Sequence, residues 1–501
     1  MTQPNIVLIM TDTQPTTVVG CYSGNDVATV EIDALAARGV RFDHAYCASP
    51  LCTPARAGIF TGMTPSRAGA YTNSQPLGGT IVHMGQRLQT AGYRTAFIGK
   101  WHLDGHDYFG SGTCPAGWEA SYWYDGKNYL VDLATEEAGL WRSGLMGAGN
   151  LRKHGITSEF TWAHRIGDRA ERFLAEQSAD SPFLLVTSFD EPHHPWTCPP
   201  EYVERFMDVR LPIGPSAFDD LKSKPQHQRD WADGWLGVQD PTGELYQPLM
   251  LGCNAYVDSQ MGRVARTVQQ WSEANDRPTW IIVTSDHGDH LGAHRLRSKG
   301  PSGYEQNARI PFIVVPPDDY REGSGIGTVQ PSVVSHLDIL PTMLQLAGAK
   351  LPETLDGDSF LDLIGHEQRA ADRIALAEYN RYELGHDGFG GLEPLRMYVR
   401  WPWKLVINLH RTDELYNLEE DPDELDNRIE DSSAVESRDV LHQALIDWMY
   451  ERVDPQRGHP WEHRPWRDAG KNAWSVDAPM RPVRDDGVRP PYLNYGTAKP
   501  V

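Results

Sequence analysis

The stretch YCASPLCTPARAGIFTGMTPSR, residues 46–67, has a cysteine two positions before Pro54 and an arginine two positions after it. Pro54 favours the first turn of a helix, because its φ is already helical and its missing N–H would be unpaired there anyway. We therefore expect Cys52 at a helix N-terminus. The free N–H groups, the helix dipole and the guanidinium of Arg56 favour an anion at that place. A nucleophile there faces a negatively charged group.

Cys52-Thr53-Pro54-Ala55-Arg56, followed by Thr61-Gly62, resembles the C-x-P-x-R and T-G signature of the type I sulfatases, a family of the alkaline phosphatase superfamily. The resemblance implies that a formylglycine-generating enzyme oxidises Cys52 to formylglycine, whose hydrated aldehyde is the nucleophile. The commoner family pattern has serine where this chain has Ala55. The Cys, Pro and Arg core of the signature is intact.

Composition bounds the size and the partners of the protein. The 501 residues suffice for one large α/β domain and a smaller one. The 68 acidic and 46 basic residues give a formal net charge of −22, which argues against a nucleic acid or an anionic membrane as partner. An anionic small substrate then needs a local cationic pocket, which the motif residues would build.

The cysteines and the first residues indicate a compartment. The six cysteines lack C-x-x-C spacing, so neither a disulfide framework nor a zinc knuckle is expected. The first ten residues carry no basic segment and favour a strand over a signal peptide, and no apolar stretch is long enough for a bilayer. A reducing cytoplasm is therefore the expected location, with an unusual secretion route or a lost signal as the alternatives.

Two apolar runs, Ile6–Met10 and Trp280–Thr284, are typical of strands buried on both faces. They are followed by Asp12 and by Asp286-His287, at the strand ends where α/β proteins bind ligands. The family usually has a second aspartate where this chain has Thr13, which offers only a neutral oxygen. The resemblance implies one divalent cation, held by Asp12, Asp286, His287 and the modified Cys52. Oxygen ligands favour Ca²⁺, with Mg²⁺ or Mn²⁺ as the alternatives.

Lys100 and His102 follow a third expected strand, Thr95–Gly99, at alternate positions that point to the same side. Gly99 to Leu103 resembles the sulfatase G-K-W-H-L stretch. The resemblance implies that Lys100 binds sulfate oxygens and that His102 polarises or protonates the nucleophile oxygen. Phosphonate monoester hydrolases share the C-x-P-x-R motif but lack this lysine and histidine pair.

Asp190 to Pro195 follows a fourth expected strand, Phe183–Ser188, and resembles the family's P-H-x-P element. His193 matches its histidine, which protonates the leaving oxygen, a task that imidazole performs well near neutral pH. Lys299 lies thirteen positions after Asp286, where relatives keep a lysine on the transferred group. Arg56, Lys100 and Lys299 are then expected to offset the charge on the sulfate oxygens.

Three further residues are candidate substrate contacts: Asn73, Trp101 and His194. Residues 104–130 are rich in glycine and aromatic residues and form an insertion beside a strand end. Its aromatic rings can stack on a sugar or an aryl group, or pack within the loop. The rings in question belong to His106, Tyr108, Trp118, Trp123 and Tyr124.

The resemblance extends from about residue 4 to about residue 430, with five motifs in family order. It implies an α/β fold with a large, mixed and mostly parallel sheet sandwiched by helices, and a smaller C-terminal α+β subdomain. We expect the catalytic domain at 1–370 and the subdomain at 371–453, with antiparallel strands in 397–409 and a helix over 434–453. The irregular tail, 454–501, either is disordered or contacts a neighbouring subunit of a homo-oligomer. Four aromatic residues favour the second: Trp461, Trp466, Trp474 and Tyr492.

Three functions remain open. The first is a sulfatase acting on a sulfate ester, of a carbohydrate before a simple aryl sulfate. The second is a phosphonate monoester or phosphodiester hydrolase. Asp286-His287, Thr13 and Lys299 fit it, but Lys100 and His102 argue against it. The third is a silent sulfate-ester binding protein, which is disfavoured because every candidate catalytic position is filled.

Overall fold

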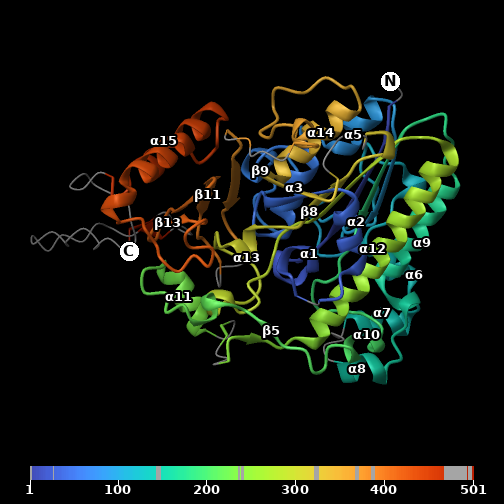
Figure 1. Cartoon of the computed structure of the whole chain (residues 1–501), viewed down its shortest axis with the longest axis horizontal. Helices are drawn as coiled ribbons and strands as arrows, with labels where there is room; N and C mark the ends of the chain where they lie inside the picture. Colours follow the sequence, from blue (N-terminus) through green and yellow to red (C-terminus); the bar gives the residue numbers. More distant parts are fainter. Residues whose placement is uncertain are drawn as a thin grey trace, which may run out of the picture.

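A seven-stranded sheet in the order β3-β4-β1-β7-β8-β2-β9 forms the centre of the molecule (Figure 1). The computed structural model describes residues 3–25, 27–142, 148–234, 237–238, 242–320, 326–366, 370, 372–384, 390–467, 493–494 and 499–500. The strands are β1 Asn5–Thr11, β2 Val40–Tyr46, β3 Arg94–Gly99, β4 Phe183–Ser188, β7 Thr279–Ser285, β8 Phe312–Val315 and β9 Thr328–Ser335. Only β8 runs against its neighbours. The predicted mixed, mostly parallel sheet is confirmed.

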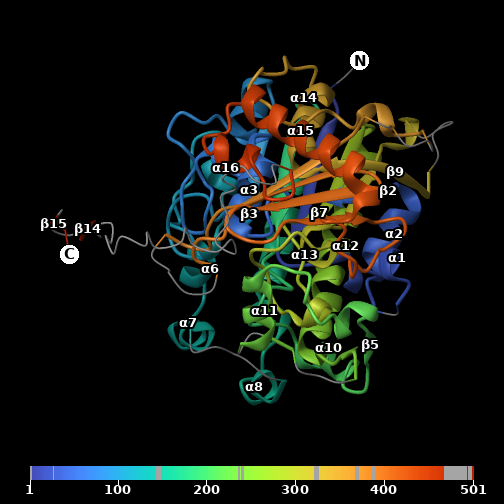
Figure 2. The ribbon, with the colours of Figure 1, turned by 90° about the vertical axis from the view of Figure 1, so that its left-hand side faces the viewer.

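Two helical layers cover the sheet, because successive residues of a strand point to opposite faces. Ile6 and Leu8 of β1 pack into one core, and Val7 and Ile9 pack into the other. The first core is closed by α3 Cys52–Thr61, α5 Met84–Thr90 and α14 Ile339–Leu346. The second is closed by α2 Val30–Arg38, α9 Trp162–Ala175 and α12 Pro248–Asn275. Figure 1 shows α3 and α14 on one side of the central strands and α9 and α12 on the other, and Figure 2 shows the same ribbon turned by 90°.

The register of the parallel strands brings the polar residues after them to one edge of the sheet. Thr11 of β1 pairs with Ser285 of β7, so Asp12 and Asp286 leave the sheet side by side. Met10 of β1 and Gly99 of β3 both pair with Ser188 of β4. The segments that carry Lys100 and Asp190 therefore emerge at the same edge, where α/β sheets bind ligands.

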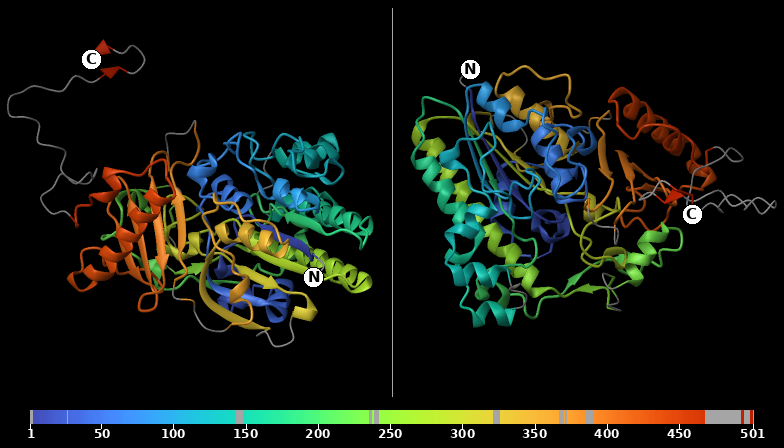
Figure 3. Two further views of the ribbon diagram at one scale, coloured as in Figure 1. Left: turned by 90° about the horizontal axis from the view of Figure 1, so that it is seen from above. Right: turned by 180° about the vertical axis from the view of Figure 1, so that it is seen from behind.

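A smaller antiparallel sheet lies against one side of the large domain (Figures 1 and 3). Its strands are β10 Ala375–Tyr379, β11 Leu395–Arg400, β12 Trp403–Asn408 and β13 Glu414–Asn417. Ala377 and Met397 face the first core of the large domain, whereas Leu376 and Leu405 face α15, Val435–Glu451. The expected small antiparallel sheet and C-terminal helix are therefore present.

The described part of the expected tail packs on its own chain. Trp461 is buried under the small sheet, and the indole N–H of Trp466 donates to Asp413 at 2.8 Å. Both rings therefore pack against the chain's own subdomain, and the contact of the tail with a neighbouring subunit stays a prediction. Trp474 and Tyr492 lie outside the described residues.

The remaining elements are short. The helices are α1 Gly20–Ser23, α4 Pro65–Ala68, α6 Gly126–Asp132, α7 Thr135–Arg142, α8 Ala148–Lys153, α10 Pro200–Glu204, α11 Gln226–Asp233, α13 Glu305–Ala308 and α16 His459–Glu462. The strands form two pairs, β5 Leu211–Pro212 with β6 Glu244–Leu245, and β14 Leu493–Asn494 with β15 Lys499–Pro500. Among the described residues, no helix combines the length and the apolar character needed to cross a membrane.

Candidate active site

The helix α3 begins at Cys52, as Pro54 predicts, and all ten of its residues are buried. Two glycines of the motif explain how it fits. A Cβ on Gly58 would lie 2.4 Å from the Cβ of Ala48, so only glycine allows this close approach. Gly62 ends the helix in the left-handed conformation, with φ of 62°. The motif therefore both shapes the helix and brings its first residue beneath the strand ends.

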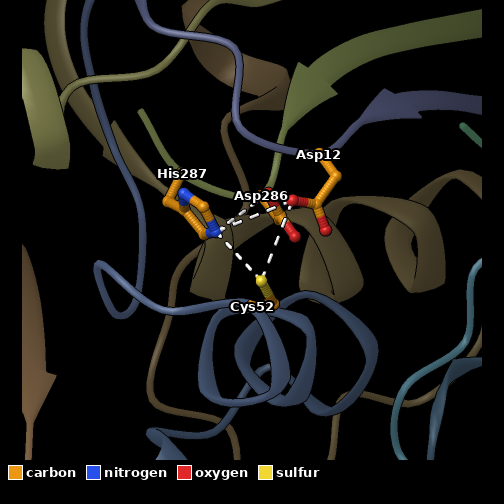
Figure 4. A group of neighbouring side chains, drawn as sticks. All are labelled: Asp12, Cys52, Asp286 and His287. Carbon is orange, nitrogen blue, oxygen red and sulfur yellow. Dashed lines mark hydrogen bonds and ion pairs between the residues drawn. The ribbon is translucent and has the colours of Figure 1, made fainter. Parts of the chain in front are cut away.

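Four side chains converge at this point: Asp12, Cys52, Asp286 and His287 (Figure 4). One ligand atom from each lies within 4.8 Å of all the others. Nδ1 of His287 lies 2.8 Å from the Gly288 carbonyl oxygen, so Nδ1 carries the hydrogen and Nε2 is left free to bind a metal. Nε2 lies 3.3 Å from Sγ of Cys52. The donor set suits a divalent cation.

Thr13 supports these carboxylates as a donor. Its hydroxyl donates to Oδ1 of Asp12 at 2.6 Å, and its backbone N–H donates to Oδ1 of Asp286 at 3.1 Å. Its φ is 62°, which is unusual for a β-branched residue. Thr13 thus orients Asp12 and Asp286 where the family commonly supplies a second charged ligand.

Three buried cations surround the carboxylates. Arg56 donates from Nε to Asp286 at 3.0 Å and from a terminal nitrogen to Asp12 at 3.1 Å. Nζ of Lys100 lies 2.7 Å from Oδ2 of Asp12. Nζ of Lys299 lies 2.6 Å from Sγ of Cys52 and 3.7 Å from Oδ1 of Asp12. The local positive charge that an anionic substrate requires is therefore present.

The carboxylates and lysines change one another's proton affinity. Burial alone would raise the pKa of Asp12, but Lys100 and Lys299 hold it well below its usual value. Burial and the neighbouring Asp12 raise the pKa of Asp286 to about 7. Burial would lower the pKa of Lys100 and Lys299, but the nearby anions raise both. In the metal-free protein Asp12 is ionised, and Asp286 titrates near neutrality.

The three other predicted histidines lie beside the group of Asp12, Cys52, Asp286 and His287. Nε2 of His193 lies 4.0 Å from Oδ1 of Asp12, and its ring stacks on His194 at 4.2 Å between centroids. His102 has φ of 58°, and its Nδ1 has no hydrogen-bond partner among the described residues. Burial and the nearby lysines lower the pKa of His193 and His102 well below the usual value, and that of His194 to about 4.

The two other candidate substrate contacts differ in position. Oδ1 of Asn73 accepts the N–H of Thr53 at 3.1 Å, directly beside Cys52. Trp101 instead packs in the first core against Phe60 and Phe97, each with 5.0 Å between ring centroids, and is 3% exposed. The structure therefore places the Trp101 ring in the core, and its contact with substrate stays a prediction.

Two further residues join the site without having been predicted there. Asp190 accepts from Nζ of Lys100 at 3.1 Å, and the hydroxyl of Tyr108 bonds to the same carboxylate. The Tyr108 ring also covers Nζ of Lys100, 3.8 Å from the ring centroid. Asp190 lies two positions after a buried strand, a signal that could have identified it. Tyr108 was assigned only to an aromatic insertion.

Glu191 gives a prediction about stability. It is 4% exposed, Oε1 accepts the N–H of Ala163 at 3.1 Å, and Oε2 has no partner among the described residues. Burial and Asp190 raise its pKa from 4.5 to about 8. Between these values the folded state holds a proton that the unfolded chain has lost, so the free energy of unfolding falls as pH rises.

We expect Glu191→Gln, which stays neutral, to gain stability over the wild type as pH rises from 5 to 8, by on the order of a few kcal/mol. Thermal unfolding across that range measures the difference. Glu176→Gln, at an exposed glutamate, is the control and should track the wild type. If the difference in the free energy of unfolding between Glu191→Gln and the wild type were the same at pH 5 and at pH 8, the assignment of a neutral Glu191 would be contradicted.

Comparison with known proteins agrees with this geometry. A family model described as Sulfatase matches residues 4–349. The chain belongs to the sulfatase family. It is accordingly a sulfuric ester hydrolase of the alkaline phosphatase superfamily. A second model, for the C-terminal part of N-sulphoglucosamine sulphohydrolase, matches residues 292–451.

Relatives of the sulfatase family match all or most of the chain. The uncharacterized sulfatase YidJ of Escherichia coli K12 is 45% identical, over 100% of this chain and 98% of its own. An N-acetylglucosamine-6-O-sulfatase of Bacteroides thetaiotaomicron is 26% identical, over 90% of this chain and 88% of its own.

Two solved structures support the fold. One, in complex with its substrate D-glucosamine-2-N,6-O-disulfate, has a TM-score of 0.72 at 22% identity, over 92% of this chain and 100% of that one. The phosphonate monoester hydrolase of Agrobacterium radiobacter has a TM-score of 0.71 at 20% identity, over 90% and 96%.

Proposed function

We propose that this sulfatase hydrolyses a carbohydrate sulfate ester through a formylglycine formed from Cys52. The position of Cys52 carries the proposal. Its side chain lies at the first residue of α3, 2.6 Å from Lys299 and within the Asp12, Asp286 and His287 group. Sγ of the unmodified cysteine stands in for a hydroxyl oxygen of the hydrated aldehyde. That hydrate supplies one hydroxyl to attack sulfur and a second whose deprotonation expels sulfate.

Asp12, Asp286, His287 and the modified Cys52 would hold one divalent cation. Such an ion supplies positive charge that polarises a sulfate oxygen and favours ionisation of a nearby hydroxyl. Two carboxylates and a modified side chain with oxygen donors favour Ca²⁺, while the imidazole keeps Mn²⁺ and Mg²⁺ as alternatives.

The surrounding side chains of this chain bind and orient the sulfate group. Arg56, Lys100 and Lys299 offset the charge on its oxygens, because all three are buried cations directed at the same group of carboxylates. His193, 4.0 Å from Asp12, donates a proton to the leaving oxygen. His102 holds or removes the proton of the second hydroxyl.

Two observations support a carbohydrate sulfate as substrate. The Bacteroides relative is named for N-acetylglucosamine-6-O-sulfate, and one structural neighbour was solved with a glucosamine disulfate. The phosphonate monoester hydrolase neighbour keeps the second function open. Lys100, which lies close to Asp12, favours the sulfatase over the phosphonate hydrolase. Phosphonate monoester hydrolases share the other motif residues of this site but lack the lysine and histidine at the positions of Lys100 and His102.

Peptide mass spectrometry of protein made with a formylglycine-generating enzyme tests the proposal. We expect aldehyde or hydrate in place of the Cys52 thiol, and hydrolysis of sulfated glucosamines and an aryl sulfate in preference to a phosphonate monoester. Modified protein that prefers the phosphonate would establish the alternative. If all Cys52 remained a free thiol and the protein bound sulfated sugars without hydrolysing them, the silent binding protein would be favoured.

A further inference from the structure

Tyr108 connects two residues of the site that lie on different strand ends. It belongs to the segment after β3, its side chain is half-buried, and its ring lies 3.8 Å from Nζ of Lys100. Its hydroxyl contacts the carboxylate of Asp190 and lies 3.1 Å from Nδ1 of His193. Asp190 in turn accepts from Lys100 at 3.1 Å. One tyrosine therefore contacts a lysine, a carboxylate and an imidazole at once.

The partners determine where the hydrogens lie. Nδ1 of His193 is 2.6 Å from the backbone carbonyl oxygen of His194, and a carbonyl only accepts. Nδ1 therefore carries a hydrogen, which it can share with the oxygen of Tyr108. The hydroxyl of Tyr108 is then directed to Asp190, which also only accepts when ionised. Nε2 of His193 is left facing the group of Asp12, Cys52, Asp286 and His287, 4.0 Å from Asp12.

We propose that Tyr108, held by Asp190, is a positioning residue that fixes the imidazole of His193 so that Nε2 faces the leaving oxygen. This inference rests on the proposed function of sulfate ester hydrolysis. Nδ1 keeps its hydrogen throughout, and Nε2 takes a proton from water when the anionic sulfate binds beside it. When the ester oxygen–sulfur bond breaks, Nε2 passes that proton to the leaving oxygen and the ring returns to its neutral form. The Tyr108 hydroxyl keeps the ring from rotating during this transfer.

Substrates with different leaving groups test this role. A sugar alkoxide needs a proton as it leaves, whereas 4-nitrophenolate leaves readily without one. We expect Tyr108→Phe to lower kcat for a glucosamine 6-sulfate by about 10- to 100-fold, and for 4-nitrophenyl sulfate by less than about threefold, with KM nearly unchanged.

The matched control is Tyr122→Phe. Tyr122 lies in the same segment, and its hydroxyl donates to Glu176 at 2.8 Å near the surface, so its loss removes the same type of bond away from the site. Both rates should stay within about twofold of the wild type. Thermal unfolding of both variants shows whether either is damaged.

A double-mutant cycle with His193→Gln gives a second readout. If Tyr108 acts through His193, the hydroxyl has nothing to position in the His193→Gln background, and Tyr108→Phe adds less than about a twofold loss there. The losses should multiply if the two residues act separately, and that result would overturn the proposal.

Other outcomes of these experiments would also overturn the proposed role of Tyr108. Equal losses on both substrates would show that Tyr108 acts on Lys100 or on the fold, and a rise in KM alone would make it a substrate contact. Unchanged kinetics would exclude any role. Each of these overturns the inference while the wild-type activity stands. A modified wild type that hydrolyses neither sulfate overturns the proposed function itself, and the inference falls with it.

Discussion

Cys52→Ser should retain the sulfo group of its first substrate molecule. Lys299 and the N-terminus of α3 still surround the side chain, so a serine oxygen at position 52 can attack sulfur. Serine offers only one hydroxyl, and release of the resulting ester then needs water to attack sulfur. We expect turnover to fall by at least about 10⁴-fold, with one sulfo group per chain visible by intact mass spectrometry.

Two variants control for this result. Cys52→Ala has no nucleophile and should gain no sulfo group. Cys21→Ala removes a half-buried thiol outside the site and should keep the wild-type rate. Turnover by Cys52→Ser within about tenfold of the modified wild type would mean that the second hydroxyl is unnecessary, and would contradict the formylglycine mechanism.

Removal of divalent cations should lower activity by at least about 100-fold, with recovery at one equivalent of ion. The affinity should also depend on pH. Asp286 in the metal-free protein has a pKa of about 7 and must lose its proton to bind the ion, whereas Asp12 is already ionised. Below pH 7 we therefore expect the affinity to fall about tenfold per pH unit, and above pH 8 to level off.

Calorimetry in buffers of different ionisation enthalpy counts the proton released on binding. Asp286→Asn should weaken binding and flatten the dependence on pH. Asp258→Asn is the matched control, because Asp258 also has a pKa raised by burial to about 7 but bonds the N–H groups of Glu31 and Ile32 instead. An affinity that stays constant from pH 5.5 to 8 in the wild type would refute the titration of Asp286. Comparison of Ca²⁺, Mn²⁺ and Mg²⁺ identifies the preferred ion.

The strands and the polar group after them could be predicted because they follow local rules. A parallel strand buried on both faces is a continuous apolar run, as in Ile6–Met10 and Trp280–Thr284. The carboxyl ends of such strands meet at one edge. These two rules place Asp12 and Asp286 at the same edge of the sheet, and the pairing of β1 with β7 brings them side by side.

The features that the sequence could not predict depend on the path of a loop or on packing. Lys100 and His102 were expected to point to one side, and the same alternation directs Trp101 to the other, into the core. The contact of Tyr108 with Asp190 joins residues 82 positions apart, through a segment with no regular period. Trp461 and Trp466 contact their own subdomain, which composition alone cannot distinguish from a neighbouring subunit.

The position of Cys52 also has a consequence for how an active molecule is made. The residue is 2% exposed, and the whole of α3 lies beneath the strand ends. An oxidising enzyme has to take several residues around its target into its own cleft, so we expect it to reach this cysteine only while the nascent chain is still open. The fraction of active molecules then depends on whether oxidation of Cys52 precedes folding of the chain during synthesis. Slower folding or more of the modifying enzyme would raise it, and treatment of the purified, folded protein would not.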